Sequence, residues 1–142
     1  MIIHHFDLFH GLTDEVVQEV ISAMETMTFS AGEVVFKAGD PADNFYVVVK
    51  GVFDLYMAGH REDPHIKIHL GEAFGWSSLV GRDTFSATVE CVEDGTLYKI
   101  DKEKLYHIMK MHPNIGVRFY RRLAGMVGGR VISCYEEMAR LR

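Results

Sequence analysis

The sequence predicts a mainly β domain with flanking helices: a jelly-roll-like β-roll, or double-stranded β-helix, with a short helical segment before it and a long helix after it. Three observations predict this class. Residues 27–100 contain short runs of β-branched and aromatic residues with a period of two. Glycines separate these runs. Apolar residues with helical spacing come before and after this stretch.

Length and composition are those of one globular domain. The chain has 142 residues, of which 48% are apolar and 25% charged, and this excludes the disordered and low-complexity classes. We expect no membrane span and no secretory leader, because no long apolar run and no basic stretch followed by an apolar one are present. Cys91 and Cys134 lie far apart, which favours a reducing, cytoplasmic location over a disulfide scaffold or zinc site.

The first predicted element is a short helix that begins after Thr13. The Thr13 hydroxyl can accept a free backbone N–H, and Asp14 and Glu15 suit the positive end of the helix dipole. An apolar face with helical spacing follows, and we expect it to pack in the core: Val17, Val20, Ile21 and Met24.

The middle of the chain predicts six short strands. They are Glu33–Lys37, Phe45–Lys50, Val52–Met57, His65–Leu70, Ser86–Val92 and Thr96–Ile100. Between these runs lie glycines that can adopt positive φ in a chain reversal: Gly32, Gly39, Gly51, Gly71 and Gly95. Many short strands with regular turns are typical of an antiparallel roll or barrel.

The end of the chain returns to helical spacing. Lys102–Met111 predicts a short helix that ends near Pro113, and a longer helix runs from about Asn114 onward. A seam with heptad spacing follows the longer helix: Tyr120, Ala124, Val127, Val131, Cys134, Met138 and Leu141. This spacing favours pairing with a second copy, and packing on the chain's own β-roll is the alternative. We therefore divide the chain into a β-roll region, 1–113, and a dimerisation helix, 114–142.

Two features of the long helix bear on its role. Gly125, Gly128 and Gly129 each cost about 1 kcal/mol relative to alanine, so they serve either close helix packing or bending. Residues 117–142 hold six arginines and two glutamates, and we expect these arginines to pair with the acidic body rather than with a nucleic acid. Cys134 is expected to act as a small buried apolar side chain rather than as a redox crosslink.

An ordered set of motifs resembles a known family. The set comprises Phe29, Gly32-Glu33, Val35-Phe36, Gly39-Asp40, Phe45-Tyr46-Val47-Val48, Gly51 and Gly71-Glu72-Ala73-Phe74-Gly75. From about residue 6 to 135 the sequence resembles the cyclic-nucleotide-binding domains, such as those of the catabolite activator protein and of the regulatory subunits of cAMP-dependent protein kinase. The resemblance implies a non-enzymatic regulatory sensor with a small-molecule effector and no resident cofactor. It also implies that the following helices move or dimerise when the effector binds.

The resemblance places a phosphate-binding cassette at Gly71 to Val89. A short helix near Gly75 is expected to direct backbone N–H groups at an anion. Ser77 and Ser78 either add hydroxyl donors or only cap that turn. The candidate ligand-contacting residues stand at the two ends of the cassette: Phe74, Gly75, Trp76, Ser77, Ser78, Arg82, Phe85, Ser86, Ala87 and Thr88.

Two cassette positions depart from the family pattern. Nucleotide-binding members have a glutamate for the ribose hydroxyl and an arginine for the cyclic phosphate, where this chain has Trp76 and Phe85. Each lost contact is worth about 1.5–3 kcal/mol, which together is about 10²–10⁴ in affinity. We therefore expect a sensor of a small molecule or anion other than cAMP or cGMP. Together with Phe74, the two aromatic residues either line an apolar cavity or fill it.

Two other functions stay open at this point. A conventional cAMP or cGMP sensor would use Arg82 as a substitute cation together with the cassette amides. A ligand-free dimeric scaffold would fill the pocket with its own side chains and bind a partner regulatory protein. We expect no enzymatic activity, because no nucleophile elbow or phosphate loop is present. Direct DNA readout is not expected, because no winged helix-turn-helix follows the long helix.

The histidines do not predict a metal or haem centre. His65 and His69 stand about 13 Å apart along a strand, too far to share an ion. His107 or His112 would bind haem only if they faced the cavity. The N-terminal cluster is expected to be a disordered end rather than a metal site: His4, His5 and His10.

Overall fold

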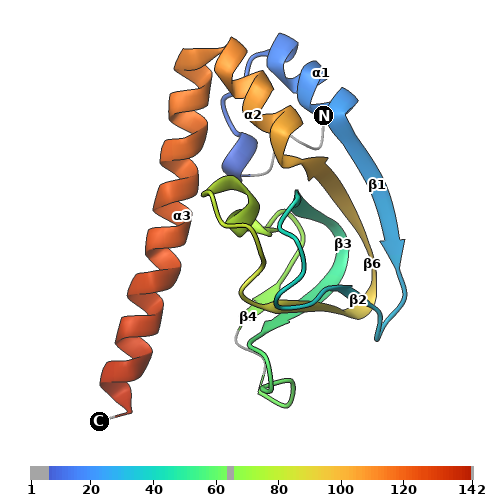
Figure 1. Cartoon of the computed structure of the whole chain (residues 1–142), viewed down its shortest axis with the longest axis vertical. Helices are drawn as coiled ribbons and strands as arrows, with labels where there is room; N and C mark the ends of the chain where they lie inside the picture. Colours follow the sequence, from blue (N-terminus) through green and yellow to red (C-terminus); the bar gives the residue numbers. More distant parts are fainter. Residues whose placement is uncertain (1–6, 64–65, 142) are drawn as a thin grey trace.

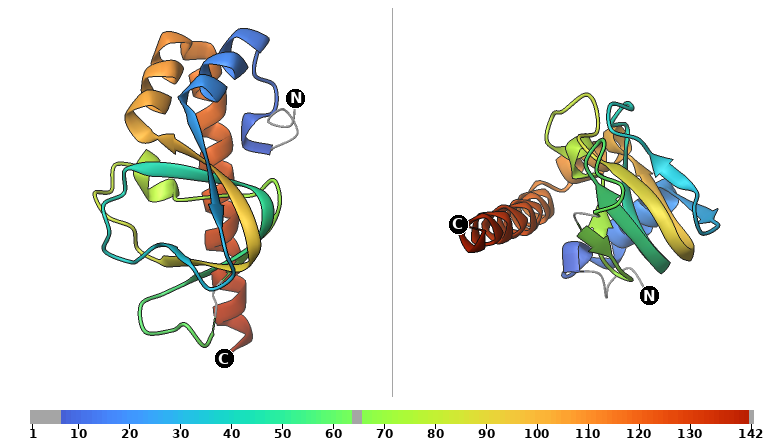
Figure 2. Two further views of the ribbon diagram at one scale, coloured as in Figure 1. Left: turned by 90° about the vertical axis from the view of Figure 1, so that its right-hand side faces the viewer. Right: turned by 90° about the horizontal axis from the view of Figure 1, so that it is seen from below.

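The computed structural model describes residues 7–63 and 66–141 and confirms the predicted fold class. The strands are β1 (Met24–Phe29), β2 (Val34–Phe36), β3 (Asn44–Tyr56), β4 (Ile66–Ile68), β5 (Ala73–Phe74) and β6 (Thr88–Asp101). The helices are η2 (Asp7–Phe9), α1 (Asp14–Ala23), η3 (Trp76–Leu79), α2 (Lys102–Met111) and α3 (Pro113–Arg140). The described strands form one curved antiparallel sheet in the order β1–β6–β3–β4, with β2 paired to β6 and β5 paired to β3. Helices α1 and α2 cover one end of this roll, and α3 runs along its side (Figure 1 and Figure 2).

Helix α1 begins as predicted and ends one residue earlier than its apolar spacing suggests. The Val16 N–H donates to the Thr13 hydroxyl over 3.4 Å, which confirms the N-cap. Met24 was expected on the helix face, but it is extended and opens β1. The predicted strands did not include β1. It pairs with β6 from Met24 opposite Ile100 to Phe29 opposite Gly95, so long-range pairing overrides the local helical spacing.

Strands β3 and β6 are long and continuous where four shorter strands were predicted. The predicted breaks at Gly51 and Gly95 are irregularities inside these strands, where the pairing register shifts. A Cβ on Gly51 would lie 2.6 Å from the Glu93 carbonyl oxygen, and one on Gly95 would lie 2.6 Å from the Lys50 carbonyl oxygen. The two glycines therefore allow the backbones to approach closely and the strands to bend, instead of reversing the chain.

The remaining strands are short and agree with the prediction in part. β2 and β4 lie within the predicted Glu33–Lys37 and His65–Leu70, although His65 is outside the described residues. β5 was not predicted because two residues carry no periodic signal. The turn glycines have positive φ as expected: Gly32, Gly39 and Gly71.

The buried apolar side chains form two clusters. The first lies between α1, α2, the start of α3 and the adjoining strands, and it includes Phe9, Val16, Leu105 and Phe119. The second fills the roll itself and is rich in aromatic residues: Phe36, Tyr46, Phe53, Phe74 and Phe85. The cassette contacts both clusters, because Phe74 and Phe85 belong to the second, whereas Ala73 belongs to the first and Trp76 packs against it.

A tight elbow connects α2 to α3. Asp101 caps α2, because its carboxylate accepts from the backbone N–H groups of Glu103 and Lys104 over 2.9 and 3.1 Å. Pro113 starts α3, as a residue without an N–H does at little cost in the first helical turn. Gly116 packs on α2, where a Cβ would lie 2.6 Å from the Met109 carbonyl oxygen. Within the described residues, no helix combines the length and the apolar character that a membrane crossing requires.

Candidate ligand-binding site

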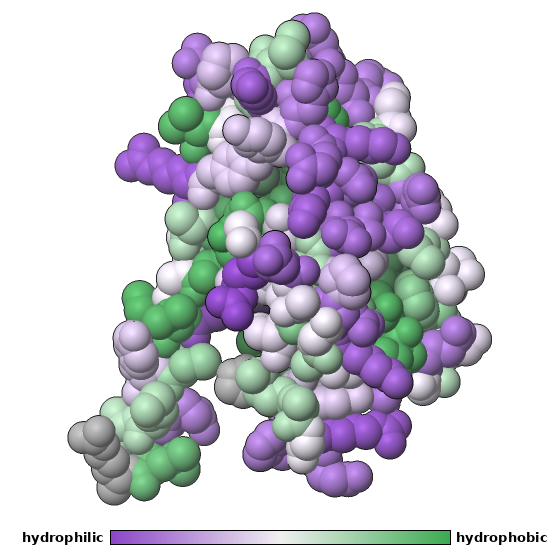
Figure 3. Space-filling view, viewed as in Figure 1, coloured by the Kyte–Doolittle hydropathy of each residue, from purple (hydrophilic) through white to green (hydrophobic). Residues whose placement is uncertain are grey.

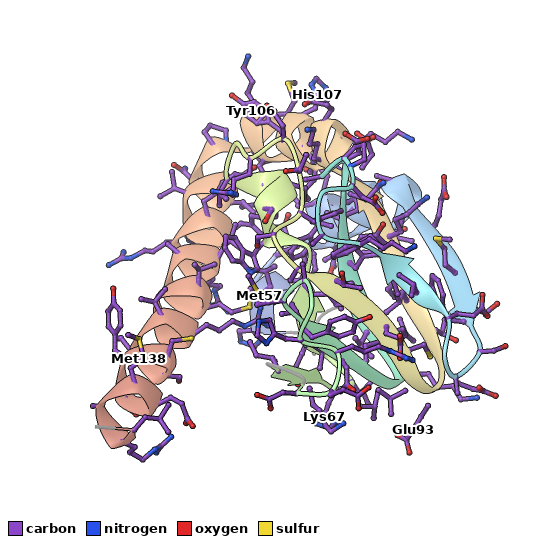
Figure 4. The ribbon with its side chains drawn as sticks, turned by 60° about the horizontal axis from the view of Figure 1, so that its bottom comes forward. Met57, Lys67, Glu93, Tyr106, His107 and Met138 are labelled. Carbon is purple, nitrogen blue, oxygen red and sulfur yellow. The ribbon has the colours of Figure 1, made fainter. Side chains whose placement is uncertain are left out.

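A cavity of about 260 Å³ lies between the mouth of the roll and α3. Its wall is formed by β2, the end of β3, β4, both ends of the cassette and the second half of α3. Met57 stands at the edge of the roll on the side that faces α3 (Figure 4). The cavity opens beside a wider groove of about 1040 Å³, which is visible as the hollow between the C-terminal part of α3 and the body (Figure 3).

Stacked aromatic rings in the core hold the first end of the cassette. Phe74 is fully buried and stacks on Tyr46 with 5.1 Å between ring centroids. It therefore belongs to the core, and the prediction that it lines the cavity is wrong. Burial, helped by the charge of Asp43, raises the pKa of Tyr46 to about 12. Gly75 has a φ of 83°, and a Cβ there would lie 3.1 Å from the Asn44 carbonyl oxygen, which is why only glycine fits this part of the wall.

The next three residues form the η3 turn, and they do not all face the cavity. Trp76 and Ser77 line it. The Ser78 hydroxyl donates to the Gly75 carbonyl over 2.7 Å, and Ser78 is absent from the cavity wall. The Ser78 hydroxyl is therefore used inside the η3 turn, and no side chain that the structure describes caps the start of that turn.

The second end of the cassette contributes an aromatic wall. Phe85 lines the cavity and stacks on Phe36 with 3.6 Å between ring centroids. Ser86 and Ala87 line it too, and their contact with a ligand stays a prediction. Thr88 lies outside the wall, where its hydroxyl accepts from the Ala38 N–H over 3.0 Å.

Arg82 is not part of the cavity. Its side chain is exposed, and it belongs neither to the cavity wall nor to that of the groove. The backbone N–H of Arg82 donates to the Ser77 carbonyl over 3.3 Å, which holds this loop against η3. In this structure the cassette therefore brings no cation to the cavity.

Helix α3 closes the cavity with residues from the predicted seam. Val127, Val131 and Cys134 line it, as does Arg130, which the sequence analysis treated only as one of several tail arginines. The side chain of Arg130 is partly buried, and its Nη2 donates to the Ala73 carbonyl over 3.0 Å. Burial lowers the pKa of Arg130, and the charge of Glu72 opposes this effect. A sequence signal existed, since Arg130 lies three residues after Val127 and four before Cys134, next to the seam.

The rest of the seam lies in different surroundings. Tyr120 packs edge-on against Phe119 in the first core cluster, and its burial raises its pKa. Ala124 is exposed. Met138 and Leu141 are 59% and 80% exposed and border the groove. The heptad spacing thus combines residues that pack on the chain's own body with residues that do not.

None of the histidines that the structure describes lines the cavity. His107 is exposed on α2, at the opposite end of the molecule from the groove (Figure 4). His112 Nε2 lies 2.6 Å from a carboxylate oxygen of Glu19, which ties the α2–α3 elbow to α1. His4, His5 and His65 lie outside the described residues, which contain no group of three or more His, Cys, Asp or Glu side chains arranged for a metal ion.

A β-roll with a cassette at its mouth and a helix across the cavity defines the class of a ligand-sensing regulatory domain. The model of the cyclic nucleotide-binding domain family matches residues 26–112. The chain belongs to this family, whose members are regulatory sensor domains.

A curated relative supports the assignment. The cAMP-dependent protein kinase type II regulatory subunit of Drosophila melanogaster is 32% identical over 104 residues, which are 72% of this chain and 26% of that protein. The chain spans little more than a quarter of the length of the curated relatives it matches.

Solved structures share the fold over nearly the whole chain. The catabolite activator protein of Thermus thermophilus is 27% identical with a TM-score of 0.79, covering 95% of this chain and 62% of that one. The sensor domain of the transcriptional regulator DNR from Pseudomonas aeruginosa has a TM-score of 0.77 at 17% identity, covering 92% and 89%. At that identity the second likeness concerns the fold alone.

Proposed function

We propose that this domain is a non-enzymatic, cytoplasmic regulatory module that binds a small molecule other than a conventional cyclic nucleotide in the cavity beside α3. The observation that carries the proposal is the composition of the cavity wall. Both Trp76 and Phe85 line the cavity, and the sequence resemblance aligns them with the family's ribose-binding glutamate and phosphate-binding arginine. Phe85 is 5% exposed and stacked on Phe36, so a fixed ring occupies the place of a mobile cation.

Calorimetric titration with cAMP and cGMP tests this proposal. We expect the wild-type chain to show no saturable binding at low micromolar concentration, because two charge-assisted contacts are missing. The double variant Trp76→Glu/Phe85→Arg restores both family residues and should gain about 10²–10⁴ in cAMP affinity. Tight binding of cAMP by the wild-type chain would refute the proposal.

The single variant Trp76→Glu is the matched control for folding. Phe85 is buried, so an arginine there lowers stability, whereas Trp76 is partly exposed and tolerates a carboxylate better. Melting curves of all variants accompany the titrations. Trp76→Glu alone should recover about one tenth to one hundredth of the full affinity gain.

A conventional cAMP sensor is the second candidate, and the names of the curated relatives favour it. In that case Arg82 would have to leave its exposed loop and enter the cavity. The variant Arg82→Ala would then abolish cAMP binding. Under the first proposal the same variant changes nothing, since Arg82 does not line the cavity.

We also propose that two copies pair through the second half of α3. The support is the heptad spacing together with the exposure of Met138 and Leu141 at its end. Sedimentation should show a dimer for the wild-type chain and a monomer for Met138→Glu. Ile132→Glu is the matched control, because Ile132 is 57% exposed on the same half of the helix but outside the seam. A monomeric wild-type chain at high concentration would contradict the pairing.

A further inference from the structure

The cavity has one charged side chain in its wall among the residues that the structure describes. The other lining groups are apolar or aromatic side chains, backbone, and the small polar groups of Ser77, Ser86 and Cys134. The charged one is Arg130, which also borders the wider groove. The cation is therefore supplied by α3, which runs along the side of the roll, and not by the cassette (Figure 1).

The guanidinium of Arg130 is incompletely bonded. Its Nη2 donates to the Ala73 carbonyl over 3.0 Å. Its Nη1 is buried and has no hydrogen-bond partner among the described residues. Buried donors are nearly always satisfied in folded proteins, and an unsatisfied charged donor is among the costliest groups to bury. An acceptor supplied by a ligand would remove that cost.

The size and lining of the cavity restrict what the rest of the ligand can be. An apolar cavity of about 150 Å³ already holds one benzene ring. The 260 Å³ beside α3 therefore suits one ring with a short side arm, in contact with Trp76 and Phe85. A planar guanidinium matches a carboxylate, because its parallel N–H groups can meet both oxygens.

We infer that Arg130 recognises the anionic end of a small apolar acid, of the class of aromatic carboxylates, whose ring occupies the cavity. This inference rests on the proposed function, because it names the ligand class of the same cavity. Nη1 is buried in the ligand-free chain, so binding of the acid requires the guanidinium to turn, present Nη1 to the cavity and adjust its contact with the Ala73 carbonyl. A bound acid then joins α3 to the roll through an added ionic contact.

The test compares phenylacetate with its neutral analogue phenylacetamide. The two have nearly the same shape, so the difference in their affinities isolates the negative charge. Calorimetry on the wild-type chain should show phenylacetate binding about 10- to 100-fold more tightly. In Arg130→Met the ratio of the two affinities should fall to about one. In Arg130→Lys the ratio should be intermediate, because lysine keeps the positive charge but lacks the paired N–H groups of the guanidinium.

Arg121→Met is the matched control, because Arg121 is exposed on the same helix and lies outside both cavity walls. It should keep the wild-type preference for the acid. The ligand-free Arg130→Met chain should melt at the same temperature as the wild type or higher, since a buried unsatisfied charge is replaced by an apolar chain of similar length. This melting measurement separates loss of recognition from loss of folding.

Several outcomes would overturn the inference. They are an unchanged preference for the acid in Arg130→Met, equal binding of the two probes by the wild type, and no binding of either probe. Equal binding that is lost in Ala87→Leu, which narrows the cavity, would overturn the role of Arg130 but support the cavity as a ligand site. Tight cAMP binding by the wild type would instead overturn the proposed function itself.

Discussion

The two halves of α3 belong to one unbroken helix but have opposite surroundings. In the first half, Gly116, Phe119 and Leu123 are buried and pack with α2 and η2. In the second half, Ile132 and Tyr135 are 57% and 65% exposed. The first half is part of the core, whereas the second half touches the body mainly along the cavity.

This difference separates the structural from the responsive part of the helix. Packing fixes a helix in a protein more strongly than intrinsic propensity does. From Gly125 onward the helix has little packing and three glycines that weaken it, with nothing within 4 Å of a Cβ placed at any of them: Gly125, Gly128 and Gly129. Within the described chain these glycines do not serve close packing, so bending and contact with another molecule are the roles left. A ligand bound in the cavity as we propose would contact this second half directly.

Truncation of a buried ring should give the largest contrast between the halves. Phe119→Ala removes a side chain that is 1% exposed and should lower the free energy of unfolding by about 3–5 kcal/mol. Ile132→Ala, at an exposed position outside the seam, should change it by less than about 0.5 kcal/mol. Urea denaturation measures both. Similar losses for the two variants would show that the second half is packed after all.

Alanine substitutions of two glycines should have effects of opposite sign. Gly116→Ala places a Cβ 2.6 Å from the Met109 carbonyl and should destabilise the fold by about 1–3 kcal/mol. Gly128→Ala meets open space and should stabilise it by about 0.8–1 kcal/mol. Thermal unfolding of the two variants measures the sign of each change. A loss of stability in Gly128→Ala would show that a side chain at this position meets a neighbouring group.

The two ion pairs at the ends of α3 should differ least. Glu19→Gln weakens the half-buried contact with His112 at the elbow and should cost about 1 kcal/mol. Arg140→Ala breaks the exposed pair with Glu137 and should cost less than about 0.5 kcal/mol. Denaturation in low and high salt distinguishes them, because salt screens exposed pairs more strongly. An equal cost for both variants would show that the Glu19–His112 contact stabilises the fold no more than an exposed ion pair does.

Local patterns were sufficient to predict most of the fold. Helix caps and apolar spacing depend on neighbouring residues, so α1, α2 and α3 were predicted with nearly correct bounds. Gly51 and Gly95 were misplaced because a flexible backbone suits both a turn and a bulge. What distinguishes the two is the carbonyl on the facing strand, which sequence spacing does not reveal.

Only part of the predicted cassette lies in the cavity wall, because Ser78, Arg82 and Thr88 are outside it. Trp76, Ser77, Phe85 and the two residues that follow Phe85 do face the cavity. Arg130 was missed because its role requires α3 to lie across the mouth of the roll, far along the chain from the cassette. Phe74 was misassigned because a phenylalanine is equally suited to the buried core and to an apolar cavity wall, and the sequence alone does not distinguish the two.

The elbow at His112 determines where movement of α3 can begin. With the first turns locked against the Met109 carbonyl and the core, the remaining segment from Gly125 onward acts as a lever about 24 Å long at 1.5 Å per residue. A bend of about 10° at the glycines would carry its tip by about 4 Å, nearly the rise of one helical turn. A chemical event confined to a cavity the size of one ring can thereby be amplified into a displacement that a neighbouring molecule can detect.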